Sequence, residues 1–168
     1  MKIKIIPLEN KYLEETIKLV NKIFPVQDDE ENVEEAFRAS LNFSKYKNLL
    51  KKWKIPNLEY FIAYDEDKKC VVGTSGIYEI ENDSNSAWVG WTSVNPEYRR
   101  KGIGKKLVQY IINESKKRGY KIMKLHTVDI DYQKNAHKLY KSLGFKLIKK
   151  EKEREIGHDR LYYELNLK

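Results

Sequence analysis

The 168-residue chain contains few of the residues that crosslink or interrupt a polypeptide: one cysteine, four prolines and eight glycines. The single cysteine, Cys70, cannot form an internal disulfide, and its apolar neighbours favour a buried structural thiol. A disulfide-stabilised secreted scaffold is therefore excluded. We expect a protein of a reducing compartment, the cytoplasm.

Long hydrophobic runs are also absent, since no apolar stretch approaches the ~18 residues of a membrane-spanning helix. The first residues, Met1 to Pro7, lose their apolar character too early for a signal peptide. Hydrophobic residues make up 40% of the chain and aromatic residues 12%, which excludes a disordered chain. With neither a Gly/Ser-rich linker nor a repeat, we expect a single domain over residues 1–168 and no membrane partner.

The net charge of +8 is unevenly distributed along the chain. Residues 1–94 hold 13 lysines and arginines against 16 acidic residues, a net charge of −3. Residues 95–168 hold 20 against 9, a net charge of +11. A basic surface of this kind can bind nucleic acid or a polyanionic cofactor.

The stretch from Trp91 to Leu107 favours the cofactor. Pro96 ends a strand, and Gly102-Ile-Gly104 then opens a helical pattern, so backbone N–H groups can turn toward an anion. Three cations, residues 99–101, precede the glycines, an arrangement suited to a pyrophosphate. The spacing matches neither a Walker A loop nor a dinucleotide fingerprint. The alternative is a basic strand–helix turn with glycines needed only for geometry.

The hydrophobic periodicity predicts a mixed α/β (α+β) fold with about seven strands in a central sheet and about four flanking helices. Asn10 is a candidate helix cap, and a further short helix is suggested within residues 42–57. The expected strands cover residues 2–7, 58–64, 70–80, 87–94, 122–128, 145–148 and 161–167. The expected helices begin near residues 10, 32, 102 and 134.

Two motifs resemble the signatures of the GNAT N-acetyltransferase superfamily. The first is Arg99-x-x-Gly102-x-Gly104, directly after a Val-x-Pro strand end; the second is Ala136-x-x-x-Tyr140-x-x-x-Gly-Phe, about forty residues later. Together they cover roughly residues 85–148, and the earlier part matches only in its order of elements. The resemblance implies the GNAT fold and direct transfer of an acetyl group from acetyl-CoA to a primary amine in a ternary complex.

The resemblance also implies roles for particular residues. The pantetheine arm would bind backbone groups of Thr92, Ser93 and Val94 between two splayed strands. The pyrophosphate would be held by Arg99, Arg100, Lys101, Gly102, Ile103, Gly104 and Lys105. Tyr140 would be the general acid that protonates the CoA thiolate, although without the motif its packing under the last strands is the simpler interpretation. Gln133, where the family often has Asn, and Ala136 would also face the cofactor, and no metal is expected.

The general base is left open by the sequence. Many family members place a glutamate on the fourth strand, where this chain has Trp88. The remaining candidates are Glu79, Glu81, Asp129, Asp131 and His126, although each has a structural interpretation as a turn residue or a core histidine. A water chain or an amine of low pKa would need none of them.

The acceptor amine is not identified either. In the family, the first two helices line the acceptor side, and here this region holds six carboxylates, at residues 28–31, 34 and 35. They could attract a cationic amine or simply start a helix. Two other functions stay open: a non-catalytic acyl-CoA-binding sensor, and acetylation of an RNA-linked or protein amine. A nucleic-acid partner is disfavoured, because acidic residues interrupt the C-terminal lysines, and a homodimer is left open.

Overall fold

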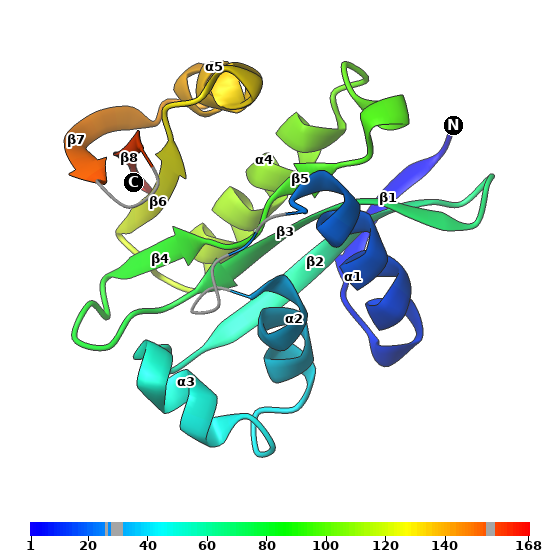
Figure 1. Cartoon of the computed structure of the whole chain (residues 1–168), viewed down its shortest axis with the longest axis horizontal. Helices are drawn as coiled ribbons and strands as arrows, with labels where there is room; N and C mark the ends of the chain where they lie inside the picture. Colours follow the sequence, from blue (N-terminus) through cyan, green and yellow to red (C-terminus); the bar gives the residue numbers. More distant parts are fainter. Residues whose placement is uncertain (26, 28–31, 154–156) are drawn as a thin grey trace.

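The computed structural model describes residues 1–25, 27, 32–153 and 157–168. Among these residues, five α-helices accompany one eight-stranded mixed sheet (Figure 1). The helices are α1 (Asn10–Ile23), α2 (Val33–Leu41), α3 (Lys47–Trp53), α4 (Ile103–Lys117) and α5 (Lys134–Ser142). The strands are β1 (Ile3–Pro7), β2 (Leu58–Asp65), β3 (Cys70–Tyr78), β4 (Ser86–Val89), β5 (Ser93–Val94), β6 (Ile122–Val128), β7 (Lys146–Glu153) and β8 (His158–Asn166).

This architecture confirms the expected mixed fold and corrects three details. The strand expected over residues 87–94 is split into β4 and β5, which adds one strand. The short helix α3 forms, which adds one helix. Asn10 is the first residue of α1 rather than its cap; Glu9 takes the cap position and makes no side-chain cap hydrogen bond. The capping prediction therefore fails, and the helix is held by its buried apolar face instead.

The sheet has the strand order β1-β2-β3-β4-β6-β8-β7, with β5 paired beside β4 on β3. Neighbouring strands are antiparallel except β4 and β6. These two parallel strands pair only from Ser86 to Trp88, against Ile122 to Lys124. Beyond that point β6 continues to pair with β8 as far as Val128. The two halves of the sheet therefore part after three residue pairs, and Figure 1 shows β6, β7 and β8 standing apart from β2 and β3.

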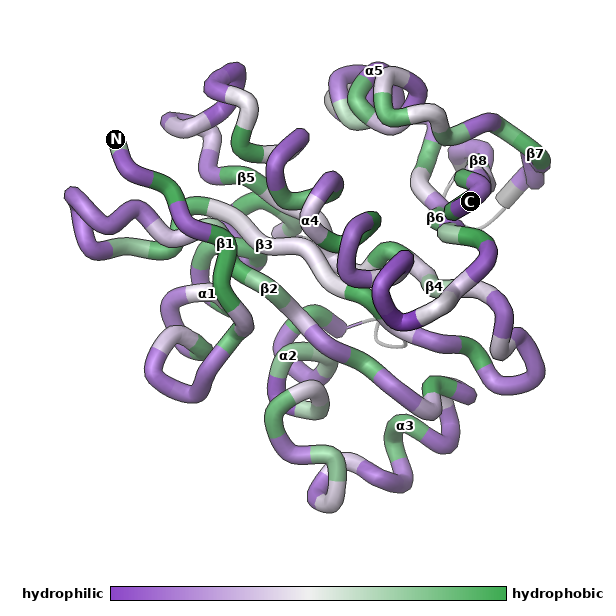
Figure 2. Tube along the Cα trace, turned by 180° about the vertical axis from the view of Figure 1, so that it is seen from behind, coloured by the Kyte–Doolittle hydropathy of each residue, from purple (hydrophilic) through white to green (hydrophobic). Residues whose placement is uncertain are grey.

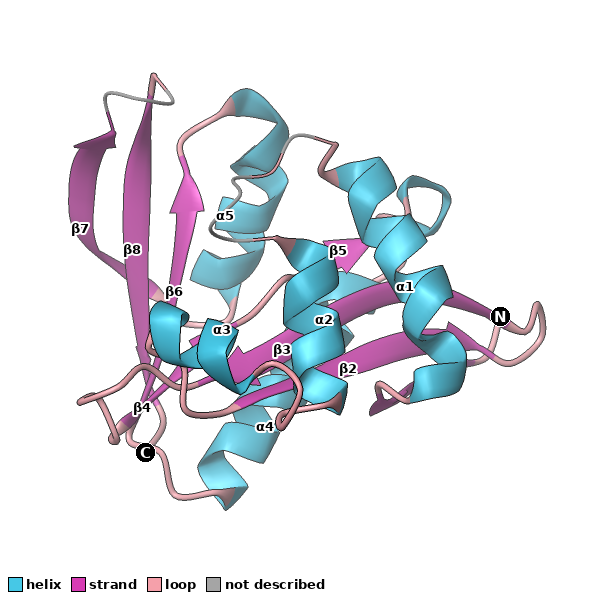
Figure 3. Cartoon of the chain, turned by 60° about the horizontal axis from the view of Figure 1, so that its bottom comes forward, coloured by secondary structure: helices cyan, strands magenta, loops and turns pink. Residues whose placement is uncertain are grey.

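The helices cover the two faces of the sheet unequally. Helices α1, α2 and α3 pack on the face formed by Tyr60 and Ile62 of β2. Helices α4 and α5 pack on the opposite face, against Met123 and Leu125 of β6 (Figure 3). Figure 2 shows hydrophobic and hydrophilic colouring mixed along the strands, and hydrophilic colouring on many of the turns at their ends.

Helix α4 is the central element of the second layer. Its residues Ile103, Leu107, Val108 and Ile111 recur at helical spacing and are at most 2% exposed. Burying each such side chain stabilises the fold by roughly 1.5–3 kcal/mol. This apolar stripe fixes the start of α4, and hence the glycine turn before it, against β3.

Candidate active site

The turn before α4 has the backbone geometry of an anion-binding nest. Arg100 and Gly102 have positive φ angles of 60° and 78°, whereas Lys101 between them does not. Alternation of this kind turns successive N–H groups toward one side. The first helical hydrogen bond runs from Lys106 N–H to Gly102 O at 3.0 Å, so the N–H groups of residues 103–105 precede the ladder. These donors, with the positive end of the helix dipole, suit a phosphate group.

The cationic side chains of this turn lie on the surface around the nest. Arg99 Nε donates to Val94 O at 3.2 Å, and Lys101 Nζ donates to Glu97 O at 3.1 Å. Both side chains therefore hold the turn onto the strand end, while Arg100 and Lys105 are exposed beside them. The residues expected to meet a pyrophosphate thus lie in this turn and in the first residues of α4.

A buried tyrosine just before the glycine turn joins it to the end of β2. Tyr98 is only 4% exposed, and its hydroxyl donates to Asp65 Oδ2 at 3.1 Å. Burial alone would raise the pKa of the Asp65 carboxyl, but the N–H groups of Lys68 and Asp67 and the Tyr98 hydroxyl together lower it below its ordinary value. The pKa of Tyr98 is raised, first by burial and then by Cys70 and Asp65. Sequence analysis missed this anchor, because its two members are 33 positions apart.

Between β4 and β5 lies a one-residue bulge. Val89 of β4 pairs with Ile77, and Ser93 of β5 pairs with Thr74. The chain therefore advances four residues from Val89 to Ser93, while β3 advances only three between their partners. Within the bulge, the Thr92 hydroxyl donates to Gly90 O at 3.0 Å and lies 2.7 Å from Ser75 Oγ. Ser75 was not predicted, and no local pattern marks it.

Tyr140 lies next to this bulge, on the face covered by α4 and α5. It is 8% exposed and packs edge-on against Phe145, with ring centroids 5.8 Å apart. Burial raises the pKa of Tyr140 to about 12, and a side-chain hydrogen bond with Thr92 opposes this shift. The phenol is therefore neutral at ordinary pH and can donate a proton.

The fold also brings the two sequence motifs together. A Cβ added at Gly104 would lie 3.4 Å from Leu139, the residue before Tyr140. Gln133 takes the N-cap position of α5 without a side-chain cap hydrogen bond, and its side-chain oxygen accepts a hydrogen bond from Thr127. Ala136 is half-buried in the same core. The glycine turn, the bulge and Tyr140 thus lie close together, beside the point where β4 and β6 part.

Two of the candidate bases, Glu79 and Glu81, follow β3. Glu79 accepts a hydrogen bond from Tyr120, near the end where β4 and β6 are still paired. Glu81 lies in the exposed turn beyond it. Neither carboxylate reaches the opening.

The carboxylates after β6 are engaged elsewhere as well. Asp129 lies 3.4 Å from Lys150 of β7, and Asp131 lies 2.6 Å from Lys134 with 92% of its side chain exposed. His126, the fifth candidate, lies on β6 itself, with its ring 6.3 Å from the Trp88 ring.

The acidic segment that was expected on the acceptor side is described only in part. Residues 28–31 lie outside the described residues. Glu34 forms an ion pair with Arg38 at 2.9 Å, and Glu35 lies in the first turn of α2, whose N-cap is Asn32. Both therefore have a helix-stabilising role. Trp91 packs against Phe24 with ring centroids 5.4 Å apart, which places the end of α1 beside the bulge.

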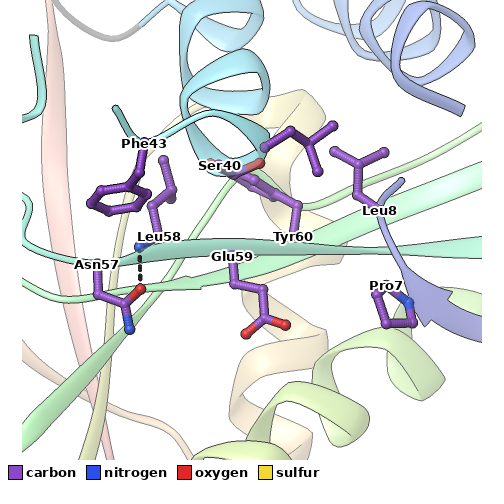
Figure 4. Close-up of a pocket in the computed structure, with 9 residues that line it drawn as sticks. Pro7, Leu8, Ser40, Phe43, Asn57, Leu58, Glu59 and Tyr60 are labelled. Carbon is purple, nitrogen blue, oxygen red and sulfur yellow. Dashed lines mark hydrogen bonds between the residues drawn. The ribbon is translucent and has the colours of Figure 1, made fainter. Parts of the chain in front are cut away.

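Two hollows of the surface lie away from these residues. One of about 310 Å³ lies where β2 extends past the end of β1, below α2, and is lined by Phe43, Leu58 and Tyr60 among others (Figure 4). Another of about 440 Å³ lies between the end of α4 and the end of β8. Neither contains a residue of the two motifs. An anion nest needs exposed N–H groups rather than deep walls, so the turn can bind an anion without a hollow beside it.

Among the described residues, no group of three histidine, cysteine or acidic side chains is placed to hold a metal ion. Within the same residues, no helix has the length and apolar character to cross a membrane.

Comparison with known proteins decides the family. A family model for the Acetyltransferase (GNAT) family matches residues 13–145. The chain belongs to this family. It is 30% identical over 96 residues to the uncharacterised N-acetyltransferase YsnE of Bacillus subtilis, and these residues cover 57% of this chain and 61% of YsnE. It is 31% identical over 143 residues to the uncharacterised N-acetyltransferase MJ1207 of Methanocaldococcus jannaschii, covering 77% of this chain and 60% of that protein. The chain thus spans about three fifths of the length of these relatives.

Solved structures of GNAT proteins share the fold of the whole chain. An acetyltransferase of the family from Desulfovibrio desulfuricans superposes with a TM-score of 0.76 at 15% identity, covering 99% of this chain and 100% of the other. Arabidopsis thaliana NAA60 in complex with acetyl-CoA gives a TM-score of 0.72 at 18% identity, covering 98% of both chains. Both the GNAT assignment and the mixed fold expected from the sequence are therefore confirmed.

Proposed function

We propose that this GNAT acetyltransferase moves an acetyl group from acetyl-CoA to a primary amine, with Tyr140 as the general acid. The observation that carries the proposal is the contact between the two motifs: a Cβ at Gly104, beside the nest, would lie 3.4 Å from Leu139, and the next residue, Tyr140, interacts with Thr92 of the bulge. The binding of acetyl-CoA by NAA60, a protein of the same fold, supports the choice of acyl donor.

The residues present fit such a cosubstrate. The N–H groups at the start of α4, with the exposed cations beside them, would bind the two phosphates. The backbone of Thr92, Ser93 and Val94 would bind the pantetheine arm along the edge that β6 leaves unpaired. Gln133 and Ala136 would bound the other side of the arm. Acetyl-CoA supplies an activated acyl group on sulfur.

Tyr140 would then donate its proton to the departing thiolate. Its pKa of about 12 keeps the phenol protonated until that thiolate forms. General acid catalysis of this kind contributes roughly 10²–10⁴-fold to a rate. The hydrogen bond with Thr92 would hold the phenol toward the opening.

The proposal is tested by measuring CoA binding and acetyl transfer in parallel. Arg99→Ala with Arg100→Ala should raise the CoA dissociation constant at least about tenfold, because charge-assisted hydrogen bonds contribute roughly 1.5–3 kcal/mol each. The matched control is Lys51→Ala with Lys52→Ala on α3, which removes the same charge far from the loop. Calorimetry gives the dissociation constants. A value within twofold of the parent for the arginine pair would refute the loop assignment.

Transfer itself is measured as free thiol released from acetyl-CoA over a panel of peptides with free α-amines, spermidine and lysine. We expect acceptor-dependent release with at least one class of amine. Tight CoA binding without release on any acceptor would instead favour the acyl-CoA sensor.

A further inference from the structure

The proposed transfer needs a group that takes the proton of the attacking amine. The fourth strand supplies none, since β4 carries Trp88 and no carboxylate or histidine. The four carboxylates that the sequence offered have other surroundings: Glu79, Asp129 and Asp131 contact Tyr120, Lys150 and Lys134, and Glu81 lies in the exposed turn after β3. This leaves one candidate among them that lies at the opening itself.

His126 lies where β4 and β6 part. Lys124 is the last residue of β6 that pairs with β4, and His126 is the next residue on the same face of the strand. Its ring lies between those of Trp88 and Tyr162, with centroid distances of 6.3 and 6.1 Å. A half-buried imidazole is thus placed at the point where the gap in the sheet begins.

The flanking rings have fixed positions. Trp88 Nε1 donates to Asp83 at 3.4 Å, and the Tyr162 hydroxyl donates to Glu151 at 3.0 Å. Each ring is thereby held at its far end, and the imidazole between them is constrained by packing on both sides.

His126 and Tyr140 lie on opposite faces of the sheet. Leu125, the neighbour of His126, belongs to the core cluster that contains Tyr140, and side chains of successive strand residues point to opposite faces. A thioester lying in the gap would therefore have the phenol on one side and the imidazole on the other. This is the arrangement that proton donation to sulfur and proton removal from an incoming amine require together.

We propose that His126 is the general base of the transfer and that the acceptor amine approaches from its face of the sheet, beside Trp88 and Tyr162. This inference rests on the proposed function. The amine nitrogen forms a bond to the thioester carbonyl carbon and passes a proton to the imidazole. The carbon–sulfur bond breaks, its electron pair goes to sulfur, and Tyr140 protonates the thiolate. The imidazolium proton then returns to the phenolate through solvent, so the net products are an amide and CoA.

Several charged groups share this face and bear on the titration of His126. Lys124 forms an ion pair with Asp83 at 2.9 Å and lies 3.9 Å from Glu164. From the neighbouring strands come Lys149 and Glu151 of β7, which pair with each other at 3.0 Å, and Arg160 of β8. These groups are three carboxylates and three cations.

The test is the pH dependence of transfer by His126→Gln, assayed with whichever acceptor of the panel gives the fastest thiol release. Loss of a general base lowers kcat by about 100-fold or more. A base works only when it is unprotonated, so the wild-type kcat should fall as pH falls through the pKa of the base in the ternary complex. This decrease, the acid limb of the pH profile, should be absent from the variant. The matched control is His158→Gln, which removes an exposed imidazole at the start of β8. It should keep the wild-type kcat and profile.

A second variant distinguishes loss of the base from loss of the folded structure. His126→Ala, assayed with and without added imidazole, should regain part of its rate in proportion to the free base, while its CoA dissociation constant stays at the wild-type value. A glutamine variant with wild-type kcat and an unchanged acid limb, in an enzyme that does transfer acetyl groups, overturns the role of His126 alone. A wild-type protein that releases no thiol with any acceptor overturns the proposed function together with it.

Discussion

Replacement of Tyr140 by phenylalanine tests the chemical role of one oxygen atom. The variant keeps the ring that packs 5.8 Å from Phe145 and 6.5 Å from Tyr163, and it removes only the hydroxyl and its hydrogen bond with Thr92. Because phenylalanine keeps the ring, removal of the hydroxyl leaves the apolar packing intact. We therefore expect a melting temperature within a few degrees of the wild type.

The expected kinetic effect is much larger than the structural one. Without a proton donor, kcat should fall by about 100-fold or more, and a 100-fold loss corresponds to about 2.7 kcal/mol of transition-state stabilisation. The CoA dissociation constant should change little, because the phosphates bind elsewhere. An acid acts only in its protonated form, so activity that depends on Tyr140 is lost as pH rises through about 12. Below that pH, Tyr140 should produce no alkaline limb in the kcat profile.

The assay is steady-state thiol release at saturating acetyl-CoA, with calorimetric CoA binding and thermal unfolding of the same preparations. Tyr163→Phe is the matched control, since Tyr163 is a buried tyrosine of the same cluster and burial raises its pKa as well. It should retain the wild-type kcat. If Tyr140→Phe turned over within threefold of the wild type, the phenol would not be the acid and its burial would be structural only.

Two further variants test the loop. Gly102→Ala should lower the free energy of unfolding by about 1–2 kcal/mol and weaken CoA binding, because a residue with a Cβ is strained at a φ of 78°. The added Cβ itself meets nothing within 4 Å, so the strain is in the backbone. Unfolding free energy and CoA dissociation constant both equal to the wild-type values would contradict this. Asp65→Asn should destabilise the protein at neutral pH and raise the CoA dissociation constant, because Tyr98 loses its charged partner. The pKa of Asp65 is lowered on folding, so its stabilising contribution is present above the ordinary value of 3.8 and is lost as pH falls through the lowered pKa. The difference in unfolding free energy between Asp65→Asn and the wild type should therefore shrink in acid, and a difference that is constant with pH would contradict the assignment.

Local chemistry explains which parts of the fold the sequence predicted. Pro96 ends a strand because it has no N–H to donate, and Gly102 has the positive φ that a glycine before a helix suggests. Both signals lie within a few residues of the structure they specify. The GNAT assignment followed from two such local motifs at a fixed spacing, and the comparisons confirm it.

The parts that were missed depend on contacts between distant segments. Asn10 has a good capping side chain, but the chain enters α1 one residue earlier, at Glu9. The Asp65–Tyr98 anchor and the Ser75–Thr92 contact join residues 33 and 17 positions apart, and no periodicity reports such a pair. The position of His126 at the opening likewise depends on where the ladder between β4 and β6 stops.

The bulge between β4 and β5 links these observations physically. In a regular strand, Val89 and Ser93 are four residues apart and would point to the same face. Here Val89 packs with the α4 and α5 face, whereas Ser93 pairs with Thr74 toward α1 and α2. The extra residue therefore reverses the alternation once, as a one-residue slip must. Thr92 returns to the face of Tyr140, and this strand can no longer follow the straight path of β6. Deleting the extra residue would leave Thr92 two residues after Val89 and still on the face of Tyr140, so such a variant would remove the bulge without turning Thr92 away.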